Sequence, residues 1–352
     1  MKTAVIRVDS SVQMGTGHVM RCLTLAEQLA SNNYEVTFIT RNYEGNLYNL
    51  IREKGFKVYL LDNPVEQYNK FLDSCFIEHF KWLGIDQEKD ANETICIIKQ
   101  NYFNKVDLLV IDHYGLDYIW EKKMRSLVKE IFVIDDLADR HHDCDILLDQ
   151  NFYINMEDRY KNLVGKDCQL KLGPKYALLR KEFIEARKKR RNINKVDRIL
   201  IFFGGSDPTN ETLKAIKAIQ LLRNKNIYFD VVVGASNPNK QKIETITNKM
   251  KSANFHCQTS KMAELMLSAD LAIGAGGSTT WERCYLGLPT ITITVAENQR
   301  NVNEDLSRLG AIYYIGKSDE VSIHDIKDAL KNLINQKEVV MELSKRSLSL
   351  FS

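Results

Sequence analysis

The 352-residue chain lacks the marks of several protein classes. Its seven cysteines are scattered, odd in number and without a CxxC pair, which argues against a disulfide framework and for thiols in a reducing compartment. No apolar run reaches the about 18 residues of a membrane-spanning helix. The opening segment MKTAVIRVDSS is too short in its apolar part for a signal peptide. These absences predict a cytoplasmic protein without a membrane partner.

Excess charge of either sign is also missing. Lysine and arginine number 49 against 46 acidic residues, which leaves a formal net charge of +3. A balance of this kind does not favour nucleic acid as a partner. The one basic run, RKKRR at 187–191, is interpreted as a solvated helix end or an interdomain linker.

Several catalytic and cofactor motifs are absent. No glycine precedes Lys-Ser or Lys-Thr in the frame of a P-loop, and no G-x-S-x-G or known Cys-His spacing occurs. The dinucleotide fingerprint fails because Met20 occupies the third glycine position. The segment DRHHDCD at 139–145 has no recognised metal-ligand spacing and predicts a polar turn. Asp135 and Asp136, at the end of a predicted strand, either cap the segment that follows or bind a metal-nucleotide. We therefore expect no cofactor and no metal.

What the sequence does contain is an alternation of short β-branched runs with longer amphipathic stretches. The runs lie at 3–8, 35–40, 57–61, 107–112 and 130–135, and again at 198–203, 229–236, 270–275 and 289–295. Strands separated by helices predict a parallel sheet that is covered on both faces.

The pattern restarts near the middle of the chain. We predict an α/β fold with two doubly wound Rossmann-like domains, 1–186 and 198–352, which are joined by a basic linker at 187–197. Because ligands of such sheets bind at the carboxyl ends of the strands, the two domains are expected to face a central cleft.

Three glycine-rich turns, at 14–18, 202–209 and 274–282, each follow a predicted strand and precede a predicted helix. Backbone amides at such helix starts converge on anions, so three of them favour a phosphorylated ligand. Glycines also serve tight connections, and one turn alone is weak evidence.

Two acidic residues of these turns, Glu282 and Asp207, each have a structural interpretation. Thr279 and Glu282 have the spacing of a capping box, and a hydrogen-bonded ribose is the functional alternative for Glu282. Asp207 and Pro208 predict an N-cap followed by proline at the first helical position.

The motifs, taken in order, resemble the family of UDP-2,4-diacetamido-2,4,6-trideoxy-β-L-altropyranose hydrolases of pseudaminic acid biosynthesis. The resemblance covers most of the chain and is weakest at Asp62–Asn104, which is longer than the usual connection. The segments that carry it are SSVQMGTGHVMRCLTLAEQL, VIDHYGLD, CDILLDQNFY, LGPKYALLRKEF, FFGGSDPTN, GAGGSTTWERCYLGLPT and AENQ.

The resemblance implies a GT-B fold, UDP bound mainly by the second domain, and metal-free hydrolysis with inversion at the anomeric carbon. The histidine of the family's G-H motif, its general base, falls on His18. Tyr114 and Asn298 fall on residues of the sugar site, and Glu282 falls on a ribose-binding glutamate. A histidine at a helix N-terminus suits the role, because the helix dipole disfavours the imidazolium and leaves the ring able to accept a proton.

The expected partner is therefore a UDP-sugar, and the resemblance favours a monomer. Asp9 and Asp112, at predicted strand ends, either orient His18 or only cap loops, and Asp9 is the candidate that we retain for the orienting role. Arg21 is expected to contact the ligand, with a surface ion pair as the alternative. Besides His18, the predicted site residues are Gly15, Gly17, Arg21, Tyr114, Gly205, Ser206, Gly277, Ser278, Glu282 and Asn298.

Other functions stay open at this point. The same architecture serves glycosyltransferases, which use an acceptor in place of water, and hydrolysing UDP-N-acetylhexosamine 2-epimerases. A sugar-nucleotide-binding protein without catalysis is a further alternative, although the histidine at position 18 speaks against it.

Overall fold

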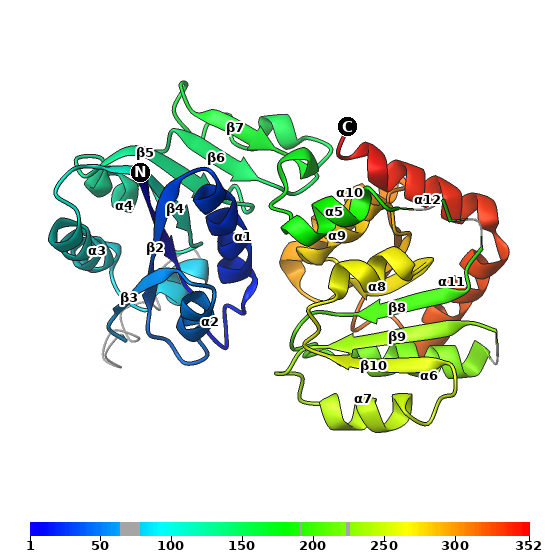
Figure 1. Cartoon of the computed structure of the whole chain (residues 1–352). Helices are drawn as coiled ribbons and strands as arrows, with labels where there is room; N and C mark the ends of the chain where they lie inside the picture. Colours follow the sequence, from blue (N-terminus) through cyan, green and yellow to red (C-terminus); the bar gives the residue numbers. More distant parts are fainter. Residues whose placement is uncertain (64–77, 191, 194, 223–225) are drawn as a thin grey trace. The chain divides into compact units, whose positions relative to one another are not determined.

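The computed structural model describes residues 1–63, 78–190, 192–193, 195–222 and 226–352. The chain divides into two compact units (Figure 1). Unit 1 comprises Met1–Asn151 and Asn155–Leu178, and unit 2 comprises Phe152–Ile154 and Leu179–Ser352. Among the described residues, no helix combines the length and the apolar character needed to cross a bilayer.

Unit 1 contains a seven-stranded sheet in the order β3-β2-β1-β4-β5-β6-β7. All of its strand pairs are parallel. The strands are β1 (Lys2–Val8), β2 (Tyr34–Arg41), β3 (Lys57–Leu61), β4 (Val106–Asp112), β5 (Val128–Ile134), β6 (Ile146–Asp149) and β7 (Gln169–Leu172). The helices are α1 (Gly17–Ser31), α2 (Tyr48–Glu53), α3 (Gln87–Asn101) and α4 (Tyr118–Met124), with 3₁₀ turns η3 (Glu78–Leu83), η4 (Met156–Asp158) and η5 (Pro174–Tyr176).

Unit 2 repeats this plan with a parallel six-stranded sheet in the order β10-β9-β8-β11-β12-β13. Its strands are β8 (Arg198–Phe202), β9 (Tyr228–Val233), β10 (Ala253–Cys257), β11 (Leu271–Ala275), β12 (Thr290–Thr294) and β13 (Tyr313–Lys317). Its helices are α5 (Lys181–Arg187), α6 (Glu211–Leu222), α7 (Lys240–Thr247), α8 (Met262–Ser268), α9 (Thr279–Leu286), α10 (Arg300–Leu309), α11 (Ile323–Asn335) and α12 (Lys337–Ser349), with the 3₁₀ turn η6 (Glu297–Gln299).

Each sheet is covered on both faces, as the apolar runs predict. In β1, Val5 belongs to the core that α3 and α4 cover, whereas Ala4 and Ile6 belong to the core under α1 and α2. The alternation follows from the two-residue period of a strand, which sends successive side chains to opposite faces. The prediction of two doubly wound α/β domains is confirmed.

The division between the units lies earlier than the expected linker at 187–197. Apart from Phe152–Ile154, the chain belongs to unit 2 from Leu179 onward, because α5 packs on the sheet of that unit. Phe183 and Ala186 of α5 are buried in one core with residues of α8 and β11. The sequence pattern placed this helix in the first domain because it precedes the first strand of the second sheet.

The long connection at Asp62–Asn104 is described in part. Residues 64–77 lie outside the described residues. The remainder forms η3 and α3, and α3 contributes Ala91 and Ile98 to the core of unit 1. This part of the connection is therefore a helical layer of the domain.

Candidate active site

The first glycine-rich turn connects β1 to α1 in unit 1. Gly15 has a φ of +73°, a conformation that glycine adopts without strain, and its amide donates to the Ser11 carbonyl at 2.9 Å. Positions 15 and 17 both border open space, since a Cβ atom added at either would meet no atom within 4 Å. Thr16 makes no side-chain cap, and the first turn of α1 holds no acidic residue. The turn therefore exposes the positive end of the helix dipole next to a space that admits a ligand.

His18 lies in the first turn of α1 and contacts Asp112, the last residue of β4. The distance from Nδ1 to Asp112 Oδ1 is 2.6 Å. Burial raises the pKa of Asp112, but the Arg21 guanidinium and His18 together hold this pKa well below its usual range. Asp112 is thus a carboxylate that only accepts, so the Nδ1 atom of His18 carries the proton. The lone pair of the neutral ring is then on Nε2, as a general base requires.

Arg21, one turn further along α1, neither forms a surface ion pair nor extends into solvent. Its Nε and Nη2 donate to the two oxygens of Asp112 at 2.6 and 2.7 Å. Its Nη1 donates to Oδ2 of Asp136 at 2.9 Å, and the side chain is 9% exposed. The surface-ion-pair interpretation is therefore wrong, because the guanidinium is buried between two carboxylates.

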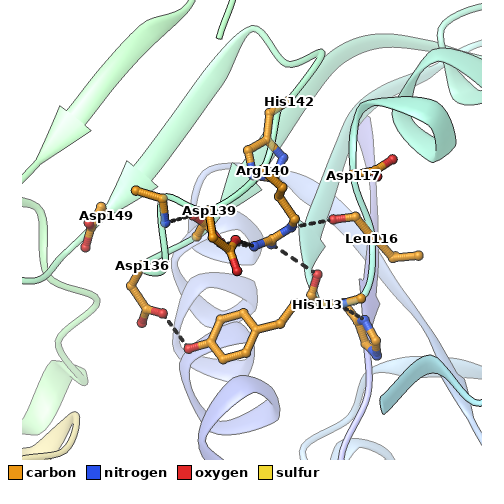
Figure 2. Close-up of polar contacts among 12 residues, drawn as sticks. His113, Leu116, Asp117, Asp136, Asp139, Arg140, His142 and Asp149 are labelled. Carbon is orange, nitrogen blue, oxygen red and sulfur yellow. Dashed lines mark hydrogen bonds and ion pairs between the residues drawn. The ribbon is translucent and has the colours of Figure 1, made fainter. Parts of the chain in front are cut away.

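Tyr114 and Asp136 close a loop of contacts around His18. The Tyr114 hydroxyl donates to Oδ1 of Asp136 (Figure 2). The Tyr114 ring meets the imidazole edge-on, with 4.5 Å between the ring centroids. We call His18, Arg21, Asp112, Tyr114 and Asp136 the His18 network. Its members come from α1 and from the ends of β4 and β5, so the sheet order brings them together.

Asp9, the preferred candidate to orient His18, lies in a different buried cluster. Its Oδ1 accepts from Arg7 Nη1 at 2.5 Å and from the backbone N–H of Arg41 at 2.6 Å. Its Oδ2 lies 3.4 Å from Nε2 of His113. The preference for Asp9 was therefore wrong, since Arg7, two residues before it on the same strand, binds its carboxylate. Asp112 takes the place next to His18.

His113, the neighbour of Asp112, does not take part in the His18 network. Its Nδ1 accepts from the N–H of Gly115 at 2.9 Å, so its proton is on Nε2, toward Asp9. Burial lowers the pKa of His113 to about 4, which keeps the ring neutral at physiological pH. His113 is thus a buried structural histidine. Of the D-H-Y-G motif, Asp112 and Tyr114 belong to the His18 network, whereas His113 belongs to the cluster around Asp9.

The segment DRHHDCD is not a simple polar turn, because Arg140, His142 and Cys144 are buried. Arg140 donates from Nε to the Leu116 carbonyl at 2.8 Å and from Nη2 to the His113 carbonyl at 3.4 Å (Figure 2). His142 contacts Glu121 at 2.7 Å. The segment thus supports the loop that carries Tyr114. In the described parts of the chain, no group of three or more His, Cys, Asp or Glu side chains is placed to hold a metal ion.

Trp82 is a neighbour of His18 that the sequence analysis missed. Its ring lies 5.6 Å from that of Tyr114 and 6.4 Å from that of His18, measured between centroids. The residue belongs to η3, in the long connection. The sequence offered no motif for it, because a single tryptophan in a long connection does not indicate which strand ends it will approach.

In unit 2, the second and third glycine-rich turns follow the neighbouring strands β8 and β11. These strands flank the point where the strand order reverses, which is the ligand-binding position of such sheets. Gly205 and Ser206 are exposed, and Gly277 and Ser278 lie directly before α9. Asn298 is exposed in η6. A Cβ atom at position 277 would lie 3.7 Å from Nε2 of Gln299, which places the third turn beside η6.

The start of α6 differs from the prediction. The helix begins at Glu211, so Pro208 lies in the preceding turn and not at the first helical position. Asp207 does cap the helix, since its carboxylate accepts from the N–H groups of Glu211 and Thr212, both at 2.9 Å. These two amides are already satisfied, whereas Ser278 at the start of α9 makes no side-chain cap.

Glu282 does not form the predicted capping box. Ser278 is the N-cap residue of α9, and Oε1 of Glu282 accepts from Nε of Arg180 at 2.9 Å. Burial raises the pKa of Glu282, and Arg180 opposes this shift. The side chain is 14% exposed. The capping interpretation is wrong because a partner on the neighbouring α5 segment holds the carboxylate.

Comparison with known proteins shows where the chain belongs. Residues 199–351 match the glycosyltransferase family 28 C-terminal domain. The chain is 31% identical over 308 residues to the UDP-2,4-diacetamido-2,4,6-trideoxy-beta-L-altropyranose hydrolase of Campylobacter jejuni, with 87% of this chain and 96% of that protein covered. The chain belongs to the family of this hydrolase. The expected resemblance is thereby confirmed.

Solved structures place the family member among GT-B folds. MurG of Acinetobacter baumannii is similar with a TM-score of 0.65 and 14% identity over 99% of this chain and 95% of that chain. The structure of Medicago truncatula UGT71G1, complexed with UDP-glucose, is similar with a TM-score of 0.65 and 14% sequence identity. The match covers 99% of this chain and 94% of that chain. These likenesses show the fold, and they confirm the predicted GT-B architecture.

Proposed function

We propose that this protein hydrolyses a UDP-linked 2,4-diacetamido-2,4,6-trideoxyhexose at its anomeric carbon, with inversion, and releases UDP and the free sugar for pseudaminic acid biosynthesis. Family membership supports the substrate class. The contact between His18 and Asp112 carries the chemistry, because in the neutral imidazole it fixes the proton on Nδ1 and the lone pair on Nε2.

In this proposal, His18 Nε2 accepts a proton from water while the water oxygen attacks the anomeric carbon. The bond from that carbon to the diphosphate oxygen breaks, and UDP leaves with the electron pair. Asp112 holds the tautomer and stabilises the imidazolium as it forms, and its own charge is maintained by Arg21. Gly15 and Gly17 admit the sugar, and Tyr114 and Trp82 supply an aromatic wall beside the base. Because His18 activates the water itself, the mechanism uses no metal.

Unit 2 binds UDP in this proposal. The diphosphate lies against the amides of Gly277 and Ser278, since those at the α6 start are bound by Asp207. Gly205 and Ser206 line the same end of the sheet after β8, and Glu282 accepts from the ribose hydroxyls. Asn298 contacts the sugar from η6.

A glycosyltransferase is the second candidate, because the match to the family 28 C-terminal domain over 199–351 favours it. The two activities differ in what attacks the anomeric carbon. A hydrolase releases UDP and free sugar from the nucleotide sugar alone, whereas a transferase requires an acceptor.

The test is incubation of the purified chain with the UDP-diacetamido sugar in ¹⁸O-labelled water, with a chelator present. We expect UDP release without an acceptor, one labelled oxygen at C1 of the sugar, and an initial anomer of inverted configuration by NMR. UDP release that requires an added acceptor would indicate the transferase instead.

The variant that decides the role of His18 is His18→Ala, with His141→Ala as its matched control. His141 is an exposed histidine of unit 1 that has no contact with the His18 network. We expect a loss of at least about 100-fold in kcat for His18→Ala and none for His141→Ala. Full activity of His18→Ala would remove the basis of the mechanism.

A further inference from the structure

Two thiols of unit 1 lie in contact at the edge of the sheet, outside the His18 network. The Sγ atoms of Cys144 and Cys168 are 3.6 Å apart. Cys144 precedes β6 and Cys168 precedes β7, the edge strand. Next to the thiols, the N–H of Gln169 donates to the Asp145 carbonyl at 2.8 Å. The start of the β6–β7 ladder therefore holds the two backbones together at this point.

The two thiols differ in exposure and in acidity. Cys144 is 6% exposed, whereas Cys168 is partly accessible. The contact with the Cys144 thiol lowers the pKa of the Cys168 thiol, against the opposing effects of burial and of the Asp145 and Glu121 carboxylates. The same contact raises the pKa of Cys144, and its burial adds to this shift. Cys168 is thus the more nucleophilic thiol, and also the one that a reagent can reach.

We propose that Cys144 and Cys168 form an oxidisable dithiol site whose substrates are low-molecular-weight disulfides such as oxidised glutathione. The Cys168 thiolate attacks one sulfur of the reagent, forms a mixed disulfide and displaces one thiolate. Cys144 loses its proton to solvent and its sulfur attacks Sγ of Cys168, which expels the second thiolate. Two cysteine thiols are oxidised to one disulfide, and the reagent is reduced to two thiols.

The product links the edge strand to the body of the sheet. Closing the bond requires the sulfurs to approach from 3.6 Å to the about 2.05 Å of a disulfide. The new bond encloses residues 145–167, so it restricts the unfolded chain and stabilises the folded unit. The thiols lie at the amino ends of β6 and β7, whereas the His18 network lies at the carboxyl ends of β4 and β5. The two sites are therefore at opposite ends of the parallel strands. The oxidised protein should therefore keep the activity of the reduced protein.

The test uses the full chain with oxidised glutathione, followed by alkylation of the remaining thiols and mass spectrometry of the intact protein and its peptides. We expect a peptide in which Cys144 is joined to Cys168, with a mass two hydrogens below the sum of the two reduced peptides, and full reversal by dithiothreitol. The midpoint of thermal unfolding should rise by about 5 °C on oxidation.

Three variants assign the roles of the thiols. Cys144→Ser should keep one glutathione on Cys168, because the resolving thiol is missing. Cys168→Ser should leave Cys144 unmodified, because the attacking thiol is missing. Cys96→Ser, which removes an exposed thiol of α3, is the matched control and should form the disulfide as the parent chain does.

The proposal does not depend on the proposed hydrolysis, since its readout is covalent. It is overturned if Cys168 of the parent chain retains glutathione while Cys144 stays reduced, or if Cys144 reacts as readily as Cys168. Peptide mapping of the parent chain alone decides this, even where a serine variant fails to fold.

Discussion

The Nδ1 atom of His18 lies 2.6 Å from Oδ1 of Asp112, although the two residues are 94 positions apart in the sequence. They meet because β1 and β4 are neighbours in the sheet, with α1 following the first of these strands and Asp112 ending the second. The strand order reverses between β1 and β4, so the segment that follows β1 and the end of β4 lie next to each other at the carboxyl ends of the strands. The topology therefore creates the pair.

The first prediction concerns the proton on His18. An amide at position 112 presents an N–H donor to Nδ1 and favours the tautomer with its proton on Nε2, which cannot act as a base. We expect Asp112→Asn to lower kcat by about 10²- to 10⁴-fold, measured with the UDP-diacetamido sugar at saturation. Asp117→Asn is the control, because Asp117 caps α4 and lies outside the His18 network. Equal kcat values for Asp112→Asn and the parent chain would show that Asp112 does not set the tautomer.

A second prediction concerns Trp82, whose ring stands 5.6 Å from Tyr114. If this ring forms a wall of the sugar site, Trp82→Ala should raise KM about tenfold with a smaller effect on kcat, while Trp82→Phe should restore most of the binding. Steady-state kinetics with the nucleotide sugar separate the two constants. A KM unchanged in both variants would place the sugar elsewhere.

A third prediction follows from Asp149, which ends β6. Burial and the nearby Asp136 charge raise the pKa of Asp149 to about 7. The folded chain then binds more protons than the unfolded chain between about pH 4 and pH 7, so its stability falls as the pH rises through this range. The total loss is on the order of 4 kcal/mol.

Asp149→Asn tests this coupling, because it removes the ionisable group and keeps the shape. Urea unfolding at pH 5 and pH 8 should show a smaller difference for the variant than for the parent chain, with the variant the more stable at pH 8. A parent chain that is equally stable at both pH values would contradict the prediction.

A fourth prediction concerns Asp90, a buried carboxylate of α3. It accepts from Arg7 Nη2 and Arg41 Nη2, each at 2.6 Å, and from Trp120 Nε1 at 2.9 Å. Asp90→Ala removes a carboxylate partner from the two buried guanidinium groups of Arg7 and Arg41. We expect it to lower the free energy of unfolding by about 3–5 kcal/mol. Chemical denaturation measures this loss. Glu88→Ala, which breaks the exposed pair with Lys123, is the control and should have no measurable effect.

A fifth prediction concerns the cap of α6. Asp207→Ala removes both carboxylate hydrogen bonds to the start of α6 and should lower the free energy of unfolding by about 1–2 kcal/mol. The φ of +44° at this position adds strain for alanine. Asp207→Asn keeps an acceptor and tolerates this backbone conformation, so it should retain most of the stability. Comparison of the two variants by thermal unfolding checks the assignment.

The sequence predicted nine of the thirteen described strands, among them the five-residue strands β3, β8, β11 and β12. It missed β6, β7, β10 and β13, which have four or five residues each. In β7, Gln169 and Lys171 alternate with two leucines at the edge of the sheet, so the strand has no continuous apolar run. Such strands form because the adjacent strand of the sheet offers backbone N–H and C=O groups for hydrogen bonding. This depends on the tertiary fold and is not visible in the local sequence.

The site was predictable to the extent that motifs mark it. His18, Arg21, Tyr114 and Asp112 were all candidates, and the structure brings them together. Asp136 was interpreted only as a cap or a metal-nucleotide ligand, because its contact with Tyr114 depends on which strands are adjacent. The choice between Asp9 and Asp112 failed for the same reason, since both end strands at one edge of the sheet.

Every strand pairing recorded between the described strands is parallel, and this has a consequence for the newly made chain. Parallel neighbours cannot be joined by a hairpin, so each pair waits for a crossover to be synthesised. One side of β1 can bind β2 early, but its other side stays open until β4 leaves the ribosome. A nascent chain with such an open edge is prone to aggregate, and a chaperone that shields it during translation would favour a high yield of native protein.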